Sequence, residues 1–172
     1  MKTESVCRKV HDLEIEVVEV EGKEDANVIL AQSHFIKTAE DVYEALRAAV
    51  PEIRFGIAFN EASGPRLVRT EGNDAELTAL AARNALRIGA GHLLVIFITH
   101  AFPINVMNAL KSVSEITTIY CATANRVKVV ICSDGEARSV LGIMDGERAV
   151  GLENESEKEK RKEFLRKIGY KL

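Results

Sequence analysis

The sequence predicts an α/β protein: a single domain built as a layered α-β-α sandwich around a mixed sheet. Three observations lead to this class. Strand-like and helix-like patterns alternate along part of the 172-residue chain. Residues 93–98 form a continuous apolar run of strand length, typical of a strand buried on both faces. The turn dipeptides Asp134-Gly135 and Asp145-Gly146 indicate hairpins, which exclude a purely parallel sheet.

Two strands and a helix are predicted before Pro51. Residues 12–20 alternate acidic and apolar side chains, so one face of this strand meets the core and the other meets water. Residues 27–31 read as a second strand. The spacing of Thr38 and Asp41 is typical of a capping box that opens a helix. That helix ends at residue 50, because proline disfavours helix in the residue before it.

The middle of the chain is predicted to hold two strands and a longer helix. The strands cover residues 53–59 and 66–70. Either Asn73 or Asp74 caps the helix that follows, and its apolar and small residues recur at three- and four-residue steps up to Ile88.

After the central strand, a short helix begins at Pro103, where a missing N–H costs nothing. A strand then ends in the small polar residues 122–125, and further strands cover residues 127–132 and 139–144. From about 153 to 170 the chain is highly charged, and we expect a solvated helix there.

The C-terminal helix carries few apolar side chains, and they fall on a narrow stripe. Phe164, Leu165 and Ile168 are its anchors. We therefore expect this helix to dock along that stripe within one domain that spans residues 1–172.

Composition excludes several classes of protein. The net charge of −3 argues against a broad nucleic-acid-binding surface, and no apolar run approaches the roughly 20 residues that span a bilayer. The N-terminus lacks the apolar core of a signal peptide, which predicts a cytoplasmic protein. Cys7, Cys121 and Cys132 are odd in number and lack metal-type spacing, so we expect reduced structural thiols and no metal site.

His92 stands where a glycine-rich turn becomes the central strand. Its imidazole could act as a nucleophile and accept a phosphoryl group, and Gly89 and Gly91 would let a substrate approach. The alternative is a histidine that is simply hydrogen-bonded at a strand edge. His100 has the same strand parity, but eight strand residues separate the two by about 26 Å. They cannot act on one substrate atom within a chain.

Asn105 and Asn108 share a face of the helix that begins at Pro103. Free amides of the first turn attract anions, and an asparagine amide both donates and accepts, which suits a base edge or a ribose. Both side chains could equally satisfy loop carbonyls.

The remaining polar candidates lie at turns and strand ends. Thr123 and Asn125 supply polar contacts beside small residues, in a pattern that also fits a hairpin corner. Asn60 and Arg69 flank a tight turn, and arginine suits phosphate through its planar fork, although surface arginines are usually solvated. Asp145 is either a turn aspartate or a catalytic base.

No motif identifies a cofactor or a phosphoryl donor. The chain contains no GxxxxGK[ST] loop, no kinase HRD or DFG set, and no GxGxxG after a strand. The phosphoryl donor, if there is one, therefore has no nucleotide-phosphate cradle that can be recognised from sequence.

Long motifs over residues 60–146 nevertheless carry a resemblance. GPRLVR, GND, NALRIGAGH, AFPINVMNALKSV, IYCATAN and LGIMDG occur in this order. Together they resemble the adenosine-specific kinase family of archaeal and bacterial proteins. That resemblance implies cytoplasmic homo-oligomers, trimers or hexamers, that bind adenosine and AMP and carry a phosphoryl group on a histidine. The glycine flanks make His92 the matching histidine.

The resemblance implies a mechanism in which His92 accepts a phosphoryl group and passes it to a hydroxyl of adenosine. Asp145 would accept the hydroxyl proton, and either Arg69 or the free amides of the helix that begins at Pro103 would neutralise charge on the phosphoryl oxygens. The side chains that would hold the nucleoside are Asn60, Asn105, Asn108, Thr123 and Asn125. An alternative of another class stays open: a non-catalytic sensor that binds adenosine or AMP without turnover.

Overall fold

The structure is a computed structural model that describes residues 13–172. Cys7 and residue 12 of the first predicted strand lie outside that range. In chain order the elements of the described part are β1 (Glu14–Glu19), β2 (Asn27–Gln32), α1 (Thr38–Ala49), β3 (Arg54–Asn60), β4 (Val68–Gly72), α2 (Ala75–Ile88), β5 (Leu93–Thr99), α3 (Pro103–Lys111), β6 (Thr118–Thr123), β7 (Val127–Ser133), β8 (Arg138–Asp145) and α4 (Glu155–Lys167).

The α/β class is confirmed, but the sheets differ from the single mixed sheet that the sequence predicted. The strands form a five-stranded sheet in the order β4-β3-β5-β2-β6 and a three-stranded sheet in the order β1-β7-β8. Every strand pair in residues 13–172 is antiparallel.

The strand order explains this difference. The helix α1 connects β2 to β3, which run in the same direction, but β5 lies between them and is antiparallel to both. Likewise α2 connects β4 to β5, and β3 lies between these strands. Strand-helix-strand units therefore join parallel strands that never pair with each other.

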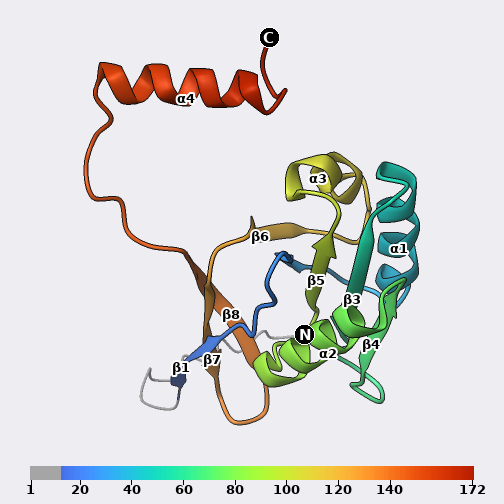
Figure 1. The fold of residues 1–172 in the computed structure, drawn as a ribbon. Coiled ribbons are helices and arrows are strands. Elements are labelled where there is room, and N and C mark those ends of the chain that lie inside the picture. The colour runs from blue at the N-terminus through green and yellow to red at the C-terminus, as the bar shows by residue number, and fades with distance from the viewer. Residues whose placement is uncertain (1–12) are drawn as a thin grey trace, which may run out of the picture.

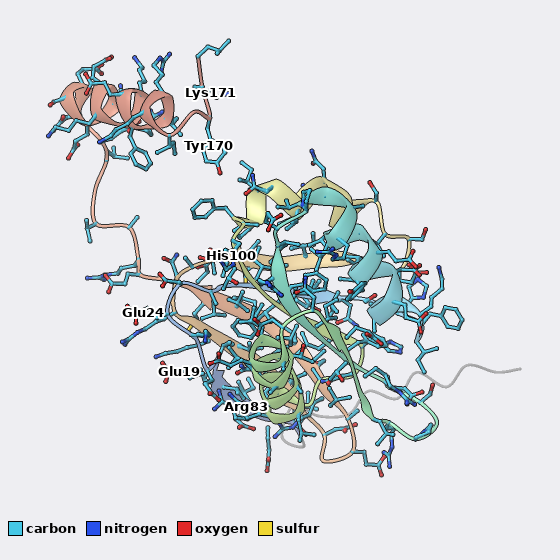
Figure 2. All side chains as sticks on the ribbon, turned by 45° about the vertical axis from the view of Figure 1, so that its right-hand side comes forward. Glu19, Glu24, Arg83, His100, Tyr170 and Lys171 are labelled. Carbon is cyan, nitrogen blue, oxygen red and sulfur yellow. The ribbon has the colours of Figure 1, made fainter. Side chains whose placement is uncertain are left out.

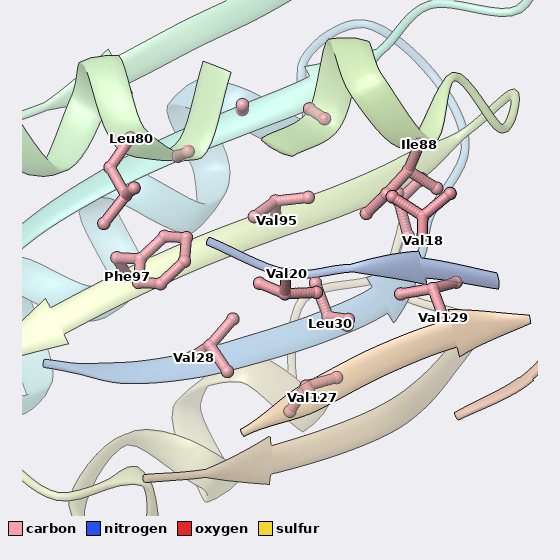
Figure 3. Packing of buried hydrophobic residues seen from close by; sticks show 14 of the residues in the cluster. Val18, Val20, Val28, Leu30, Leu80, Ile88, Val95, Phe97, Val127 and Val129 are labelled. Carbon is pink, nitrogen blue, oxygen red and sulfur yellow. The ribbon is translucent and has the colours of Figure 1, made fainter. Parts of the chain in front are cut away.

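Other elements cover both faces of the five-stranded sheet (Figure 1), and each face has a hydrophobic core. On one face, α2 and the three-stranded sheet cover the side chains of Leu93, Val95 and Phe97 of β5 (Figure 3). On the other face, α1 and α3 cover Leu94 and Ile96. All residues from Leu93 to Ile98 are buried, which confirms that the central strand is enclosed on both sides.

The predicted helix starts are confirmed at α2 and α3, whereas at α1 the position is right but the predicted capping box is wrong. The Asp74 side chain accepts a hydrogen bond from the Leu77 amide and caps α2, and Pro103 is the first residue of α3. The capping box at Thr38 does not form. Thr38 is buried, and its hydroxyl donates to the Phe35 carbonyl 2.7 Å away, so the start of α1 has no side-chain cap.

The C-terminal segment does not pack on the rest of its own chain. The helix α4 has no buried residue, and Figure 1 shows it apart from both sheets, at the end of an extended connection after β8. The side chain of Phe164 is 57% exposed and that of Ile168 is 42% exposed. The expected docking of this helix within one chain is therefore wrong.

Candidate functional site

The candidate residues lie at the two opposite ends of β5. We call the group around His92, namely Phe59, Asn60, Glu61, Arg69 and His92, the histidine end. We call the group beyond Thr99, namely His100, Asn105, Thr123, Asn125 and Asp145, the amide end. The antiparallel pairing of Leu93 with Gln32 and of Ile98 with Asn27 fixes which neighbouring residues belong to each end.

His92 is held in a strained turn before β5. Its backbone is left-handed, with φ of 60°, which is uncommon outside glycine. The His92 amide donates to the Asn60 carbonyl at 2.8 Å, and the His92 carbonyl accepts from the Ser33 amide at 3.0 Å. The half-buried imidazole stacks on the ring of Phe59, with centroids 5.8 Å apart and planes 6° apart. The surrounding structure therefore fixes both the backbone and the ring of His92.

Asn60 fixes the turn that precedes His92. Its side-chain amide is buried and donates to the carbonyls of Ala85 and Ala90, each at 2.9 Å. These bonds tie the last turn of α2 to the residues just before His92. The Oδ1 atom of Asn60 is buried and has no hydrogen-bond partner in the described part of the chain. Asn60 thus holds the residues just before His92 in place, and its Oδ1 atom can still accept a hydrogen bond.

Arg69 lies on the same face of the sheet as the ring of His92. It is directly opposite Phe59 in the β3–β4 pair, and opposite residues of an antiparallel pair project to the same side. Its Nη2 atom contacts Glu61 Oε2 at 2.9 Å. Its Nε–H is buried and has no partner among residues 13–172. A buried guanidinium donor without a partner is rare, and it suits an oxyanion that arrives next to the histidine.

The start of α1 is also at the histidine end. The Ser33 hydroxyl is 2.8 Å from that of Thr38, and Ser33 contacts His92 through its amide. The Thr38 amide donates to the Phe35 carbonyl, but no side chain caps α1, so the amides of Ala39 and Glu40 in its first turn are available to an anion. Lys37 stands beside them, and its hydrogen bonds to Asp41 and Glu115 raise its pKa, so it remains cationic at neutral pH.

A cavity of about 540 Å³ lies beside the turn that precedes His92. Asn60, Glu61, Gly91 and Arg138 are among its lining residues, whereas His92 is not. Its size falls within the range of small-molecule pockets. The glycine allows a close approach here, because a Cβ at position 91 would lie only 3.0 Å from Ala62 Cβ.

At the amide end, the structure brings three predicted residues into one hydrogen-bonded group. The Asn125 side chain donates to Asp145 Oδ1 at 3.0 Å, and its backbone amide donates to the Thr123 hydroxyl at 3.0 Å. Gly146, with φ of 68°, packs so closely on Asn125 that a Cβ would lie 2.9 Å from Asn125 Nδ2. Asn125 and Asp145 are exposed, so both can reach a ligand.

Asn105 and Asn108 have different surroundings. Asn105 Oδ1 accepts from the Phe102 amide at 2.8 Å and so caps α3, yet the residue also lines a cavity of about 720 Å³. Asn108 is exposed one turn further along α3 and does not line that cavity. Their shared helix face therefore does not bring both amides to one pocket.

Two cavities at the amide end share part of their walls. The first, of about 710 Å³, contains Asn125, and the second contains Asn105 and His100; both include Lys23, Glu24, Ala26 and Ala124. Figure 2 shows His100, Glu24 and Glu19 along this edge of the molecule. Asn105 and Asn125 thus border neighbouring hollows.

Sequence reasoning missed three residues that matter at these ends. His100 was set aside, yet it lines the amide-end cavity and has a left-handed φ of 60°. Both histidines thus lie outside the regular strand, and strand parity does not set their directions. Asn27, which is 7% exposed and donates to the Ala101 carbonyl, also lines that cavity. Phe59 could have been noticed only through its stacking on His92.

Other reactive groups in the described chain offer little chemistry. Burial raises the pKa of the Cys121 thiol to about 11, so it stays protonated at neutral pH and is a poor nucleophile. No group of three or more His, Cys, Asp or Glu in residues 13–172 is arranged to hold a metal ion. Within the same residues, no helix is long and apolar enough to cross a membrane.

Comparisons with known proteins agree with the sequence motifs. No curated protein matches the chain. Among solved structures it is similar to one described as the crystal structure of PH1918 protein from Pyrococcus horikoshii OT3, with 45% sequence identity and a TM-score of 0.90. That alignment covers 93% of this chain and 99% of the other. The family model described as "Adenosine specific kinase" matches residues 18–171. The chain therefore belongs to the adenosine-specific kinase family.

Proposed function

We propose that this protein binds adenosine and AMP and transfers a phosphoryl group to adenosine, with His92 as the residue that carries the group. The family points to an adenosine-specific kinase. The observation that supports the histidine mechanism best is the unpaired, buried Nε–H of Arg69 on the sheet face where the imidazole of His92 stacks on Phe59.

The proposed transfer has two steps. In the first, a nitrogen of the His92 imidazole attacks the phosphorus of the donor, a P–N bond forms, and the bond from phosphorus to the donor's leaving oxygen breaks. In the second, a hydroxyl of adenosine attacks the same phosphorus, the P–N bond breaks, and the neutral imidazole returns. Arg69 and the first-turn amides of α1 stabilise charge on the phosphoryl oxygens in both steps.

The nucleoside itself is assigned to the amide end. Asn105 and Asn125 border hollows large enough for it, Thr123 orients Asn125, and Asp145 accepts the hydroxyl proton. Asn108 contacts the part of the ligand that extends along α3. In this arrangement Asn60 serves the reaction by positioning the turn before His92.

This assignment requires more than one copy of the chain. Eight residues of extended chain hold the two ends about 26 Å apart, far beyond the reach of a bound nucleoside. We therefore propose a cytoplasmic homo-oligomer, a trimer or hexamer, in which the histidine end of one subunit faces the amide end of another. A site made this way would explain why the candidate residues divide between two ends.

A second function is favoured by the same separation. If subunits do not bring the two ends together, the amide end alone forms a nucleoside pocket without a phosphoryl carrier. The protein would then be a sensor that binds adenosine or AMP without turnover. The absence of a recognisable nucleotide-phosphate loop in the sequence favours this alternative.

The deciding experiment compares wild type with H92Q. The protein is incubated with ATP labelled at the γ-phosphate, acid-labile label on the protein is counted, and AMP formed from adenosine is measured separately. We expect H92Q to lose the label and the product while its adenosine affinity, measured by calorimetry, changes less than about threefold. H100Q serves as the matched control and should keep the label.

Three outcomes separate the possibilities. Equal labelling of wild type and H92Q would exclude the phosphohistidine. Saturable adenosine binding by wild type without AMP from ATP or from acetyl phosphate would favour the sensor. AMP formation that survives in H92Q would indicate direct transfer from donor to nucleoside.

A further inference from the structure

We propose that the C-terminal arm, residues 147–172, docks on a second copy of this chain, where α4 covers the exposed face of the three-stranded sheet. This inference concerns assembly and does not rest on the proposed phosphoryl transfer. It starts from two surfaces of the same chain that both lack a partner in residues 13–172.

The first surface is the apolar stripe of the arm. Phe164, Leu165 and Ile168 lie at helix spacing on α4, and Phe164 and Ile168 are exposed. Val150 and Leu152, in the extended connection before α4, are each 99% exposed. A segment of this kind gains no burial from its own chain, and isolated helices of 13 residues are marginal in water.

The second surface is the side of the three-stranded sheet that faces away from the core. Val18 of β1 points inward, so Ile15 and Val17 point outward, and they are 68% and 51% exposed. Val17 pairs with Val130 of β7, which continues the apolar row. Leu141 and Met144 of β8 are also more than half exposed. We call this set the outer face.

Charge complementarity favours the arm as the partner of the outer face. From residue 155 to 172 the arm has seven lysines and arginines against four glutamates. The strand β1, at the edge of this sheet, has three glutamates and no basic residue; Glu19 shares the outward side of Val17, opposite Lys128 of β7, whereas Glu14 and Glu16 are exposed on the other side of the strand. A basic helix with an apolar stripe thus complements the acidic edge that borders the outer face.

The extended arm also belongs to the fold shared with a crystal structure. Residues 13–146 make up less than four fifths of the 172, yet the alignment to the PH1918 structure covers 93% of this chain with a TM-score of 0.90. Much of the arm is therefore placed similarly in that chain. An exposed helix that holds one position away from its own body needs a partner, and a second copy presents the complementary face.

The test uses full-length variants and sedimentation velocity. An arm variant carries Phe164→Asp with Ile168→Asp, and a face variant carries Val17→Asp. We expect each variant alone to lose the mass of the wild-type oligomer and to sediment as a single 18.9 kDa chain. An equimolar mixture should regain a complex of at least two chains, because one intact arm and one intact outer face remain.

Matched controls keep the result interpretable. Ala79→Asp alters an exposed residue of α2, outside both surfaces and outside the cavity beside the His92 turn, and should keep the wild-type mass. If Val17→Asp fails to fold by circular dichroism, Ile15→Asp replaces it. A wild type that is monomeric, variants that keep the wild-type mass, or a mixture that stays monomeric would each overturn the proposal. Loss of phosphohistidine labelling in H92Q, with the wild-type mass kept, would instead concern only the proposed function.

Discussion

The two ends of β5 carry similar residue types but are built differently. At the histidine end, polar groups are partly buried and held by contacts between distant segments, such as Asn60 with Ala85 and Ala90. At the amide end, Asn125 and Asp145 are exposed, and the bonds of Asn105 and Asn125 are to close neighbours or to the adjacent strand. A rigid end suits chemistry at a fixed atom, whereas an open end suits the entry and release of a ligand.

The largest effect that would test this contrast is expected at Arg69. Arg69→Gln removes the unpaired Nε–H, and we expect the rate of the proposed phosphorylation of His92 to fall by about 100-fold, since one donor to a transition-state oxyanion contributes about that much. Rapid-quench measurement of acid-labile label gives the rate. Arg66→Gln, an exposed neighbour, is the control. Equal rates for both variants would show that Arg69 only pairs with Glu61.

Removal of the Asn60 side chain tests the rigidity of the histidine end. Asn60→Ala removes two buried hydrogen bonds, to the carbonyls of Ala85 and Ala90, which keep their backbone donors Gly89 and Leu93, and we expect the free energy of unfolding to fall by about 2 kcal/mol. Urea denaturation measures the change. Asn108→Ala, at an exposed site on α3, should cost less than about 0.5 kcal/mol. Similar losses at the two positions would contradict the contrast.

A smaller effect is expected at the amide end. Asn125→Ala removes its contact with Asp145 and its proposed contact with the nucleoside, and adenosine affinity should fall by about tenfold, near 1.4 kcal/mol. Calorimetry measures the affinity, and the acid-labile label on His92 should not change. If the label falls together with the affinity, the two ends are not separable in function.

The effect expected to vanish at neutral pH concerns Cys121, which is buried between the two ends. Burial raises the pKa of this thiol to about 11, whereas in the unfolded chain it ionises near 9. Because the folded state keeps its proton over that interval, stability should fall by about 1 kcal/mol per pH unit between pH 9 and 11. Denaturation of wild type and Cys121→Ala over this range measures the difference. If the stability of both proteins falls equally with pH, the ionisation of Cys121 does not contribute to the loss.

Local signals in the sequence predicted most helices and strands close to their observed positions. They predicted the wrong role for Thr38 at the start of α1. Asp74 and Pro103 act within a few residues of their own position, so their roles could be recognised. Thr38 has the same local pattern, but burial against Ser33 redirected its hydroxyl to carbonyls of the preceding turn. The free start of α1 at the histidine end is a result of that tertiary contact.

In the candidate site, too, some features follow from local sequence signals and others only from tertiary contacts. Asn125 and Asp145 belong to two separate sequence motifs. The pairing of β7 with β8 brings them into hydrogen-bond contact. His92 was identified by its glycines and by the family motif, but Phe59 and Arg69 meet on its sheet face only because β3 lies between β4 and β5. No pattern in the sequence specifies that order.

The sequence by itself determined the α/β class, the buried central strand, the turn that presents His92 and the family to which the chain belongs. These features depend on periodicity, turn residues and motifs that act over short distances. Only the tertiary structure decided the strand order, the split into two antiparallel sheets, and the separation of the histidine end from the amide end. Strand order follows from burying both faces of β5 at once, which is a property of the whole core.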